Sequence, residues 1–384
     1  MEKRKFGKTG LHTSVLGFGG FHLLEIPKKE ADYLLNKYLE SGGNYIETAE
    51  LYGNGDSEEK IGTSVSNRKK DFILTSKTIY RDKNNYIKSL NRSLKRLKTS
   101  YIDLHIMHMV GTNDKKLGLK PDDLKRILSP GGALEGAEKA KKDGKIRFIG
   151  ISMHGYPDTL IEALKNYPFD AVMATINYFD RFNFPEIEKE LMPLAIKKQT
   201  AIILMKPLAD GYLWRSAREA FRYAINQQVS VVVTGINNRK MLKDDIKYVN
   251  EFIPMSQEEE EELFKNSVEL GNYVCRQCGK CLICPEGIQI PDIFKYEGYY
   301  DRQMIDGIIR NPADFALRHR LRLWYGNSDL ARNKYSDVKI KADKCTECRE
   351  CIDKCPYNID IIQKLKIAHF KLSNINIDPL SINI

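Results

Sequence analysis

The sequence has no cysteine in its first 270 residues, and all eight of its cysteines follow in two clusters. A secreted disulfide scaffold uses cysteines throughout a short chain, so this distribution leaves metal binding or redox chemistry as the role of the thiols. The chain also lacks any run of about eighteen apolar residues, which excludes a transmembrane helix. Its charged first ten residues are followed by no apolar segment, so we expect no secretory signal and a cytoplasmic protein.

Two further features are missing. No Gly-x-Gly-x-x-Gly motif follows an early strand, which argues against an open, doubly wound nucleotide-binding sheet. The basic residues are spread along the chain and are not interleaved with aromatic residues, so nucleic-acid binding is not indicated. We interpret the formal net charge of +10 as a composition bias. A basic face would nevertheless attract an acidic protein partner or a phosphorylated ligand.

Short apolar runs alternate with amphipathic segments over the first 250 residues. We expect an N-terminal hairpin that leads into a first strand, and further strands at 44–48, 71–77, 101–108, 145–152, 169–177, 200–208 and 229–235. Helices are expected at 29–41, 57–67, 83–98, 131–143, 157–166, 185–198, 215–228 and 238–250. Eight such units imply an α/β fold, a closed (β/α)8 TIM barrel. An open doubly wound sheet is the alternative.

The charged segment at 256–264 predicts a domain boundary, with a barrel at 1–262 and a second domain at 263–384. Beyond the boundary the alternation of strands stops, and the chain instead carries helical patterns. We expect helices within 290–310, 311–324 and 361–372. The second domain is therefore predicted to be mainly α-helical.

The cysteines form two runs of similar spacing. They are Cys275-x2-Cys278-x2-Cys281-x2-Cys284-Pro285 and Cys345-x2-Cys348-x2-Cys351-x3-Cys355-Pro356. Three thiolates at this spacing can reach three irons of one cubane, and the fourth, before a proline, ligates the other cluster. We predict one [4Fe–4S] cluster on Cys275, Cys278, Cys281 and Cys355, and another on Cys345, Cys348, Cys351 and Cys284. Two zinc sites are the alternative. The runs resemble those of two-cluster ferredoxins, and the long helical spacer is similar to α-helical ferredoxin modules of anaerobic reductases.

Polar side chains collect where three predicted strands end. Glu47 and Tyr52 follow the second strand, Lys77 ends the third and His108 ends the fourth. In such a barrel, catalytic groups lie at the carboxyl ends of the strands. An ammonium beside the tyrosine is expected to lower the pKa of the phenol and make it a proton donor, while a histidine orients a carbonyl oxygen. The alternative is a solvated lysine with His105 or His108 as a core histidine.

The helix that follows this tyrosine has its own start signal. Ser57 is expected to cap the helix, with Glu58 and Glu59 in its first turn. These acidic residues suit the positive end of the helix dipole.

Over residues 3–250 the chain resembles the aldo-keto reductases. The resemblance rests on RKFGKTGL, ETAELYGNGDSEEKIG, FILTSK, YIDLHIMH and GKIRFIGIS. It implies a tetrad in which Tyr52 donates a proton, Lys77 activates it and His108 positions the carbonyl. Glu47 stands where the family has aspartate. The cysteine-rich tail is similar to that of a subgroup with a ferredoxin-like domain.

The resemblance also implies a nicotinamide site, from which this sequence departs. Ser152-Met153 stands where the family has Ser-Asn, Met173 stands in place of a glutamine, and Met205 in place of an aromatic residue. A methionine cannot donate to the carboxamide and packs more softly than a ring. These methionines are alternatively core residues.

The phosphate side of that site differs as well. Gly235 and Met241 stand where the family often has a lysine and an arginine for a 2′-phosphate. The helix beginning near Asn238 can still meet a pyrophosphate with its N–H groups, and Arg239 or Lys240 can supply charge. The expected nucleotide contacts are Gly19, Ser152, Met205, Lys206, Pro207, Gly235, Asn237 and Arg239.

These patterns predict an iron–sulfur oxidoreductase that reduces a carbonyl or oxidises an alcohol. Its electrons would be linked to two [4Fe–4S] clusters and to NADP(H) or NAD(H), with an acidic ferredoxin or flavodoxin as a partner. One alternative is a reductase without nicotinamide that uses a flavin or takes electrons from a cluster. Another is a non-catalytic electron-transfer or redox-sensing subunit.

Overall fold

The computed structural model describes residues 1–112, 117–303 and 327–373. Contacts divide the chain into two compact units. The first comprises Met1–Ile176, Ile187–Pro207 and Arg218–Pro254, and the second comprises Asn177–Glu186, Leu208–Ala217 and Met255–Ile384. The second unit therefore contains two segments from the middle of the sequence, and a domain boundary after residue 262 stays a prediction.

The first unit is a closed barrel of eight parallel strands, in the order β10-β3-β4-β5-β6-β7-β8-β9. The strands are β3 Leu16–Gly19, β4 Tyr45–Glu47, β5 Ile73–Thr78, β6 Ile102–Met107, β7 Ile146–Ser152, β8 Ala171–Thr175, β9 Ala201–Met205 and β10 Val231–Gly235. Strands that are adjacent in the barrel are consecutive in the sequence, and β10 pairs with β3 to close the ring. The predicted (β/α)8 barrel is confirmed, and the open sheet is wrong.

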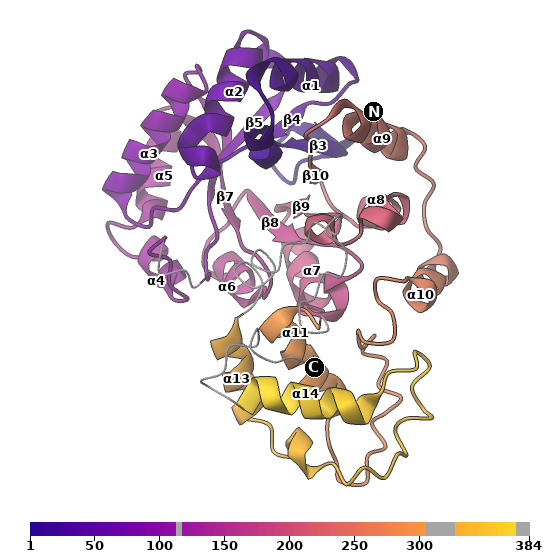
Figure 1. The fold of residues 1–384 in the computed structure, drawn as a ribbon. Helices are drawn as coiled ribbons and strands as arrows, with labels where there is room; N and C mark the ends of the chain where they lie inside the picture. Colours follow the sequence, from indigo (N-terminus) through magenta and orange to yellow (C-terminus); the bar gives the residue numbers. More distant parts are fainter. Residues whose placement is uncertain (113–116, 304–326, 374–384) are drawn as a thin grey trace. The chain divides into compact units, whose positions relative to one another are not determined.

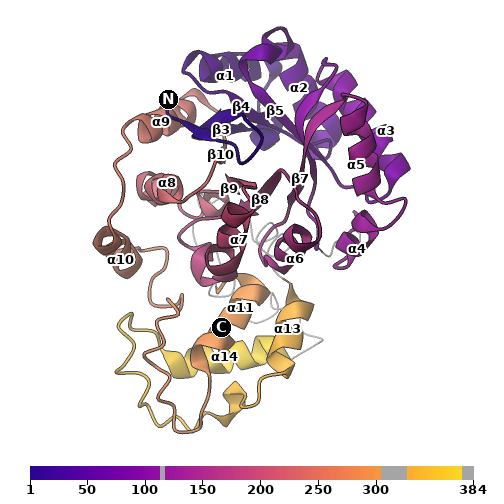
Figure 2. The same ribbon diagram turned by 180° about the vertical axis from the view of Figure 1, so that it is seen from behind.

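Helices alternate with these strands and lie on their outer side (Figures 1 and 2). They are α1 Lys28–Glu40, α2 Asp56–Val65, α3 Lys83–Arg96, α4 Asp123–Leu128, α5 Ala133–Lys142, α6 Asp158–Asn166, α7 Met192–Lys197, α8 Ala217–Asn226 and α9 Arg239–Asn250. The sequence did not predict α4. The helix expected at 185–198 is a π-helical segment, Ile187–Leu191, followed by α7.

A hairpin closes the amino-terminal end of the barrel. Its strands are β1 Lys3–Lys5 and β2 His12–Ser14, and Phe6 follows β1. Phe6 is fully buried in the barrel core, where its ring lies 5.8 Å from that of Tyr45. The interior is a packed core of strand side chains, as in other barrels of this type. The carboxyl ends of the strands are consequently the open end, where a site can form.

The start of α2 differs from the prediction. The residue before the helix is Gly55, whose φ of 100° is a left-handed conformation that suits glycine. Ser57 lies inside the first turn and is buried, and its hydroxyl donates to the carbonyl of Gly20 at 2.8 Å and pairs with Thr48 Oγ1. The predicted Ser57 cap is wrong, because tertiary partners take its hydroxyl. The expected acidic first turn is present.

The described part of the second unit contains helices and no strands. They are α10 Gln257–Asn266, α11 Ile290–Asp301, α13 Ser328–Ser336 and α14 Ile361–Ser373. Ser256 and Glu259 form a capping box at the start of α10. The helix expected at 311–324 falls outside the described residues. Within the described ranges, no helix is long and apolar enough to cross a membrane.

Candidate active site and cysteine sites

Four side chains meet at the carboxyl ends of neighbouring strands. Glu47 is the last residue of β4, Lys77 lies near the end of β5, and His108 follows β6 directly. Tyr52 begins a short 3-10 turn between β4 and α2. The parallel register of β4, β5 and β6 brings these positions to one edge. The predicted residues are therefore brought together.

Lys77 is the buried centre of this group, with 1% of its side chain exposed. Its ammonium forms an ion pair with the Glu47 carboxylate and donates to the Thr48 carbonyl at 2.9 Å. The extra methylene of Glu47, compared with aspartate, does not prevent the pair. Lys77 Nζ also lies 4.6 Å from the centroid of the Tyr52 ring, and the Tyr52 hydroxyl lies 3.4 Å from Glu47 Oε1.

The pKa of Tyr52 moves in the direction opposite to the prediction. Burial raises it, because desolvation disfavours the phenolate. The ammonium of Lys77 lies against the ring face and bonds to Glu47 and Thr48, so it does not lower this pKa below the ordinary value. Tyr52 therefore holds its proton throughout the neutral range, as a donor to an alkoxide-like oxygen must.

His108 is kept neutral by its surroundings. Its ring centroid lies 5.9 Å from that of Tyr52, and only 3% of the residue is exposed. Burial lowers the pKa of His108 well below its usual value, and the charges of Lys77, Arg81 and Lys206 act in the same direction. A neutral imidazole can donate a hydrogen bond to a carbonyl oxygen without becoming an acid.

Sequence reasoning missed the groups that hold His108. Buried Arg81 donates to the backbone carbonyl of His108 at 2.8 Å and pairs with Asp123 at 2.8 Å. The next residue, Met109, has a left-handed φ of 56°, and its N–H donates to Ser152 Oγ. Arg81 lies between β5 and α3, and Asp123 begins the short helix α4 that the sequence did not predict, so no sequence pattern indicates either residue.

The core-histidine alternative applies to the other histidine of β6. His105 is fully buried and its Nδ1 pairs with the Tyr86 hydroxyl at 2.6 Å. Burial lowers the pKa of His105 to about 3. It belongs to the wall of the barrel, whereas His108 lies beyond the strand end.

The predicted nicotinamide contacts lie at several strand ends. Gly19 and Gly235 are paired last residues of β3 and β10. Ser152, which ends β7, is buried and its hydroxyl accepts the N–H of Met109. Met205 ends β9 and is also buried, followed by Lys206 and Pro207, with a left-handed φ of 61° at Lys206.

Acidic side chains occupy the phosphate side of this region. The Asn237 amide donates to Glu25 Oε2 at 2.8 Å. Arg239 forms a bidentate pair with Glu30 at 2.9 and 3.0 Å, and its guanidinium covers the Tyr33 ring. Of the expected phosphate contacts, Asn237 and Arg239 are thus already paired with carboxylates, and a carboxylate repels a phosphate.

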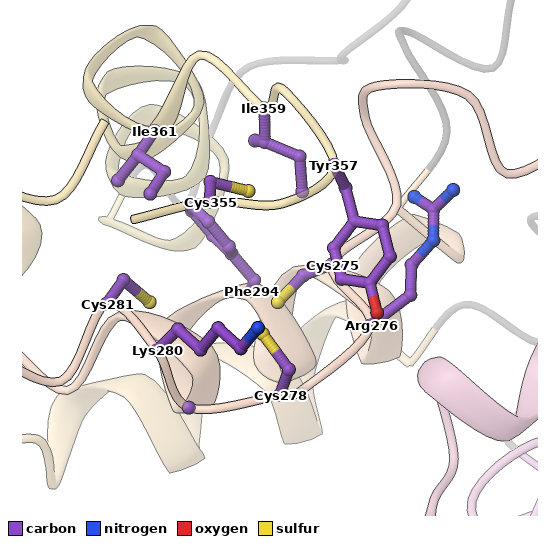
Figure 3. Close-up of a pocket in the computed structure, with 11 residues that line it drawn as sticks. Cys275, Arg276, Cys278, Lys280, Cys281, Phe294, Cys355, Tyr357, Ile359 and Ile361 are labelled. Atoms are coloured by element: carbon purple, nitrogen blue, oxygen red, sulfur yellow. The ribbon is translucent and has the colours of Figure 1, made fainter. Parts of the chain in front are cut away.

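The first cysteine site consists of Cys275, Cys278, Cys281 and Cys355. These side chains line one cavity of about 320 Å³, part of which is open to solvent, together with apolar residues such as Phe294 and Ile361. Figure 3 shows three cysteines on the loop before α11 and Cys355 on the segment before α14. The grouping is the one predicted from the Cys-Pro pattern.

The second cysteine site consists of Cys284, Cys345, Cys348 and Cys351, which line a cavity of about 310 Å³. Burial raises the pKa of Cys281 to about 12 and that of Cys351 to about 11, so these thiols are protonated when no metal replaces the proton. Across the described chain, no three His, Cys, Asp or Glu side chains are placed to hold a single metal ion. Zinc needs four sulfurs about 2.3 Å from one point, whereas cubane ligands surround a larger body.

Two family models match the chain. One, described as the aldo/keto reductase family, matches residues 15–219, and the other, described as a 4Fe-4S dicluster domain, matches residues 274–359. Among curated relatives, the uncharacterized oxidoreductase YqkF of Bacillus subtilis is 33% identical over 225 residues, covering 56% of this chain and 67% of that protein. L-galactose dehydrogenase of Arabidopsis thaliana is 25% identical over 305 residues, covering 68% and 92%.

Solved structures give the same result. Aldo-keto reductase AKR11C1 from Bacillus halodurans has a TM-score of 0.57 and 26% identity, covering 69% of this chain and 96% of its own. An aldo-keto reductase from Klebsiella pneumoniae, solved in complex with NADPH, has a TM-score of 0.55 and 21% identity, covering 69% and 94%. At 21% identity, the similarity to the Klebsiella pneumoniae structure shows a shared fold only. The first family model spans more than half of the chain, so the protein belongs to the aldo/keto reductase family, and it carries a 4Fe–4S dicluster domain.

Proposed function

We propose that this oxidoreductase interconverts a small carbonyl compound and its alcohol at Tyr52, and exchanges the electrons with two [4Fe–4S] clusters. The observation that carries the proposal is the contact of Lys77 with Glu47, Thr48 and Tyr52 beside a neutral His108. This arrangement provides one proton donor and one neutral hydrogen-bond donor at the same barrel edge.

Each residue has a distinct role in this proposal. Tyr52 donates its proton to the carbonyl oxygen during reduction and takes it back during oxidation. Lys77 stabilises the phenolate left behind, and Glu47 holds the ammonium in place. His108 orients the carbonyl oxygen by a hydrogen bond.

The test at this site is Tyr52→Phe, assayed with a panel of aldehydes and dicarbonyl compounds. A general acid contributes roughly 10²–10⁴-fold to a rate, so kcat should fall by about that factor. Tyr80→Phe, at a tyrosine that is 37% exposed, is the matched control and should keep full activity. Full activity in Tyr52→Phe would contradict Tyr52 as the proton donor, and a wild-type protein that reduces none of these compounds would support a non-catalytic subunit instead.

The two cysteine sites would hold the clusters, and each cluster supplies one electron at a time. The cavity lined by four thiols, the Cys-Pro pattern and the dicluster family model support this assignment. Chain purified without oxygen should contain about eight iron and eight acid-labile sulfide atoms. About four iron atoms or fewer, with stoichiometric zinc, would contradict the two-cluster proposal.

A nicotinamide nucleotide is the first candidate for the other electron carrier, because it supplies a hydride. A relative from Klebsiella pneumoniae holds NADPH. The Arg239–Glu30 pair is largely exposed on the arginine side, and exposed ion pairs contribute little to stability, so a phosphate can displace the carboxylate. Anaerobic titration with NADPH and with NADH tests this. Saturable binding, or cluster bleaching, by either nucleotide is expected.

A second candidate omits nicotinamide and uses a flavin or electrons taken directly from a cluster. The pairing of Asn237 with Glu25 and of Arg239 with Glu30 favours it, because both contacts on the phosphate side already have acidic partners. Absence of a binding signal from both nucleotides, with carbonyl reduction by chemically reduced enzyme, would establish this candidate over the first. Flavin would be seen in the absorption spectrum of the purified chain.

The proposed electron partner is an acidic ferredoxin or flavodoxin in the cytoplasm. The net charge of +10 supports it, since opposite charges steer association. The rate of cluster reduction by such a partner should then fall as salt is added.

A further inference from the structure

Four charged side chains are buried together between two helices of the second unit. Glu297 and Asp301 come from α11, and Lys364 and Lys371 come from α14. Lys364 donates to Glu297 Oε2 at 2.6 Å, and Lys371 contacts Glu297 Oε1 at 2.9 Å and Asp301 Oδ2 at 2.5 Å. None of the four is more than 6% exposed. Removing four charges from water is expensive, and a hydrophobic contact would serve packing equally well.

This network adjoins the first cysteine site. Lys364 Nζ lies 4.9 Å from the centroid of the Phe294 ring, which lines that cavity. Its positive charge acts to lower the pKa of Cys275, opposing the larger effect of burial. The Cys275 N–H donates to the side chain of Gln303, two residues after Asp301, at 2.9 Å. Charge added at the first cysteine site therefore acts first on Lys364, which Glu297 and Lys371 connect to Asp301.

Asp301 is the member of the network that holds its charge least firmly. It is the last residue of α11, where the negative end of the helix dipole disfavours a carboxylate. It shares Lys371 with Glu297, and its Oδ1 is buried without a hydrogen-bond partner in the described parts of the chain. Burial and the charge of Glu297 together raise the pKa of Asp301 to about 6, against the lowering effect of Lys371.

The other carboxylate behaves differently. Burial opposes the ionisation of Glu297, but Lys364 and Lys371 outweigh it and hold the pKa of Glu297 at about 2. Tyr273 also donates to Glu297, at 2.6 Å. Glu297 therefore stays ionised, and its charge is fixed.

Other charged groups near Asp301 have different partners. From α13, Arg332 reaches the backbone carbonyl of Lys371 at 3.4 Å and the Tyr300 hydroxyl at 3.5 Å. Arg302, next to Asp301 in sequence, is paired with Asp180. Of the groups facing Asp301 in the described chain, Lys371 alone forms a direct ion pair with it.

We propose that Asp301 takes up a proton from solvent when the first cysteine site, loaded with its [4Fe–4S] cluster, accepts an electron. An external one-electron donor is oxidised by one electron, the site is reduced by one electron, and one O–H bond forms on the Asp301 carboxylate. No other bond changes, and the net charge of the unit is preserved. This inference rests on the proposed clusters and is independent of the chemistry in the barrel.

The coupling has a definite sign. A negative charge added nearby raises the pKa of a carboxylate, and by reciprocity the proton makes reduction more favourable. The midpoint potential of the first site should therefore fall as pH rises above the pKa of Asp301. The limit is about 59 mV for each tenfold change in proton concentration, for a one-electron couple. At lower pH Asp301 is protonated in both redox states and the potential should level off.

The experiment is an anaerobic redox titration of the full chain, monitored by electron paramagnetic resonance at several pH values. Wild type should show one couple whose potential depends on pH and a second that does not. Asp301→Asn should remove the dependence, and Asp301→Glu should restore it. Asp337→Asn is the matched control, because Asp337 directly follows the last residue of α13 and is exposed. Cys278→Ser should shift only the pH-dependent couple, which identifies the first site.

The outcomes separate this inference from the proposed function. Two pH-independent couples in wild type, or an unchanged slope in Asp301→Asn, would overturn the inference alone. Absence of [4Fe–4S] signals in wild type would overturn the proposed function as well. If Asp301→Asn loses its cluster, Lys371→Met gives a second test. Removal of this cation raises the pKa of Asp301, so the pH dependence should begin at a higher pH, and an unmoved onset contradicts the proton site.

Discussion

At the scale of single residues, the contact between Glu47 and Lys77 is the central feature of the candidate active site. The sequence left it open whether glutamate could replace the aspartate usual in this family. In the structure the longer side chain reaches the ammonium, and both groups are almost fully buried, at 3% and 1% exposure. The Glu47 carboxylate therefore pairs with Lys77 despite its extra methylene.

Glu47→Gln should be strongly destabilising, because it leaves the Lys77 ammonium buried without its partner. Breaking one side of a buried pair costs about 3–5 kcal/mol. Chemical denaturation should show this loss, whereas the double variant Glu47→Gln/Lys77→Met should recover most of it. Glu59→Gln, at an exposed position of α2, is the control and should be neutral. Equal stability of Glu47→Gln and wild type would show that the pair is not formed.

A second prediction at this scale concerns pH. The pKa of His108 lies well below 6.5, so the ring is neutral on both sides of that pH and its titration should not appear in kcat/KM between about pH 6 and 8. Because the pKa is depressed in the fold, protonation opposes folding as pH falls below 6.5. The measurement compares wild type with His108→Gln. An inflection near pH 6.5 that disappears in the variant would contradict a neutral His108.

These residues show what sequence reasoning could and could not provide. Strand-end positions for Tyr52, Lys77 and His108 follow from the alternation of strands and helices, and the structure brings them together. The direction of the Tyr52 pKa could not be predicted, because it depends on whether Lys77 meets the hydroxyl or the ring face. The role of Arg81 could not be predicted either, since it depends on the backbone carbonyls of His108 and Met109, which follow another strand.

At the scale of elements, each cysteine site combines three cysteines of one run with the last cysteine of the other run. Cys355 belongs with the first run and Cys284 with the second, as the lining of the two cavities indicates. The pairing was predictable because each final cysteine precedes a proline, which turns the chain away from its own run. The boundaries of α2 were less predictable, since Gly55, Gly20 and Thr48 decide where that helix begins.

Pairs of cysteine substitutions test this exchange. Cys275→Ala with Cys355→Ala should remove one cluster and leave about four irons, because both residues belong to the same site. Cys275→Ala with Cys284→Ala should damage both sites and leave almost none. Iron analysis of anaerobically purified chains gives the answer. The reverse order of iron contents would show that each run holds its own cluster.

The buried lysines of α14 show how a helix sequence can indicate a buried ion pair. Lys364 and Lys371 lie on the same helix face as Ile361, Leu365 and Ala368, which is the buried face. A lysine on an apolar face is a sequence signal for a buried partner, although the partner itself cannot be identified from the pattern. Here the partners are the two carboxylates of α11, which the sequence places sixty or more residues away.

At the scale of the whole molecule, the proposed function joins one two-electron site and two one-electron sites in one chain. The family assignment and the barrel were predictable, because several motifs agree over most of the sequence. The electron carrier could not be predicted, because methionines replace the usual nicotinamide contacts and because Asn237 and Arg239 pair with Glu25 and Glu30. The proposed function therefore depends on whether electrons from the clusters reach the carbonyl.

One measurement tests this claim most directly. The clusters are reduced chemically without oxygen, excess reductant is removed, and a carbonyl compound is added with and without NADP⁺ or NAD⁺. The account predicts that the clusters are reoxidised, with two electrons lost for each alcohol formed, and that Tyr52→Phe stays reduced. Reoxidation that requires a nucleotide would identify the carrier. Clusters that stay reduced in every arm, in a wild-type protein that otherwise reduces the same carbonyl, would contradict the account.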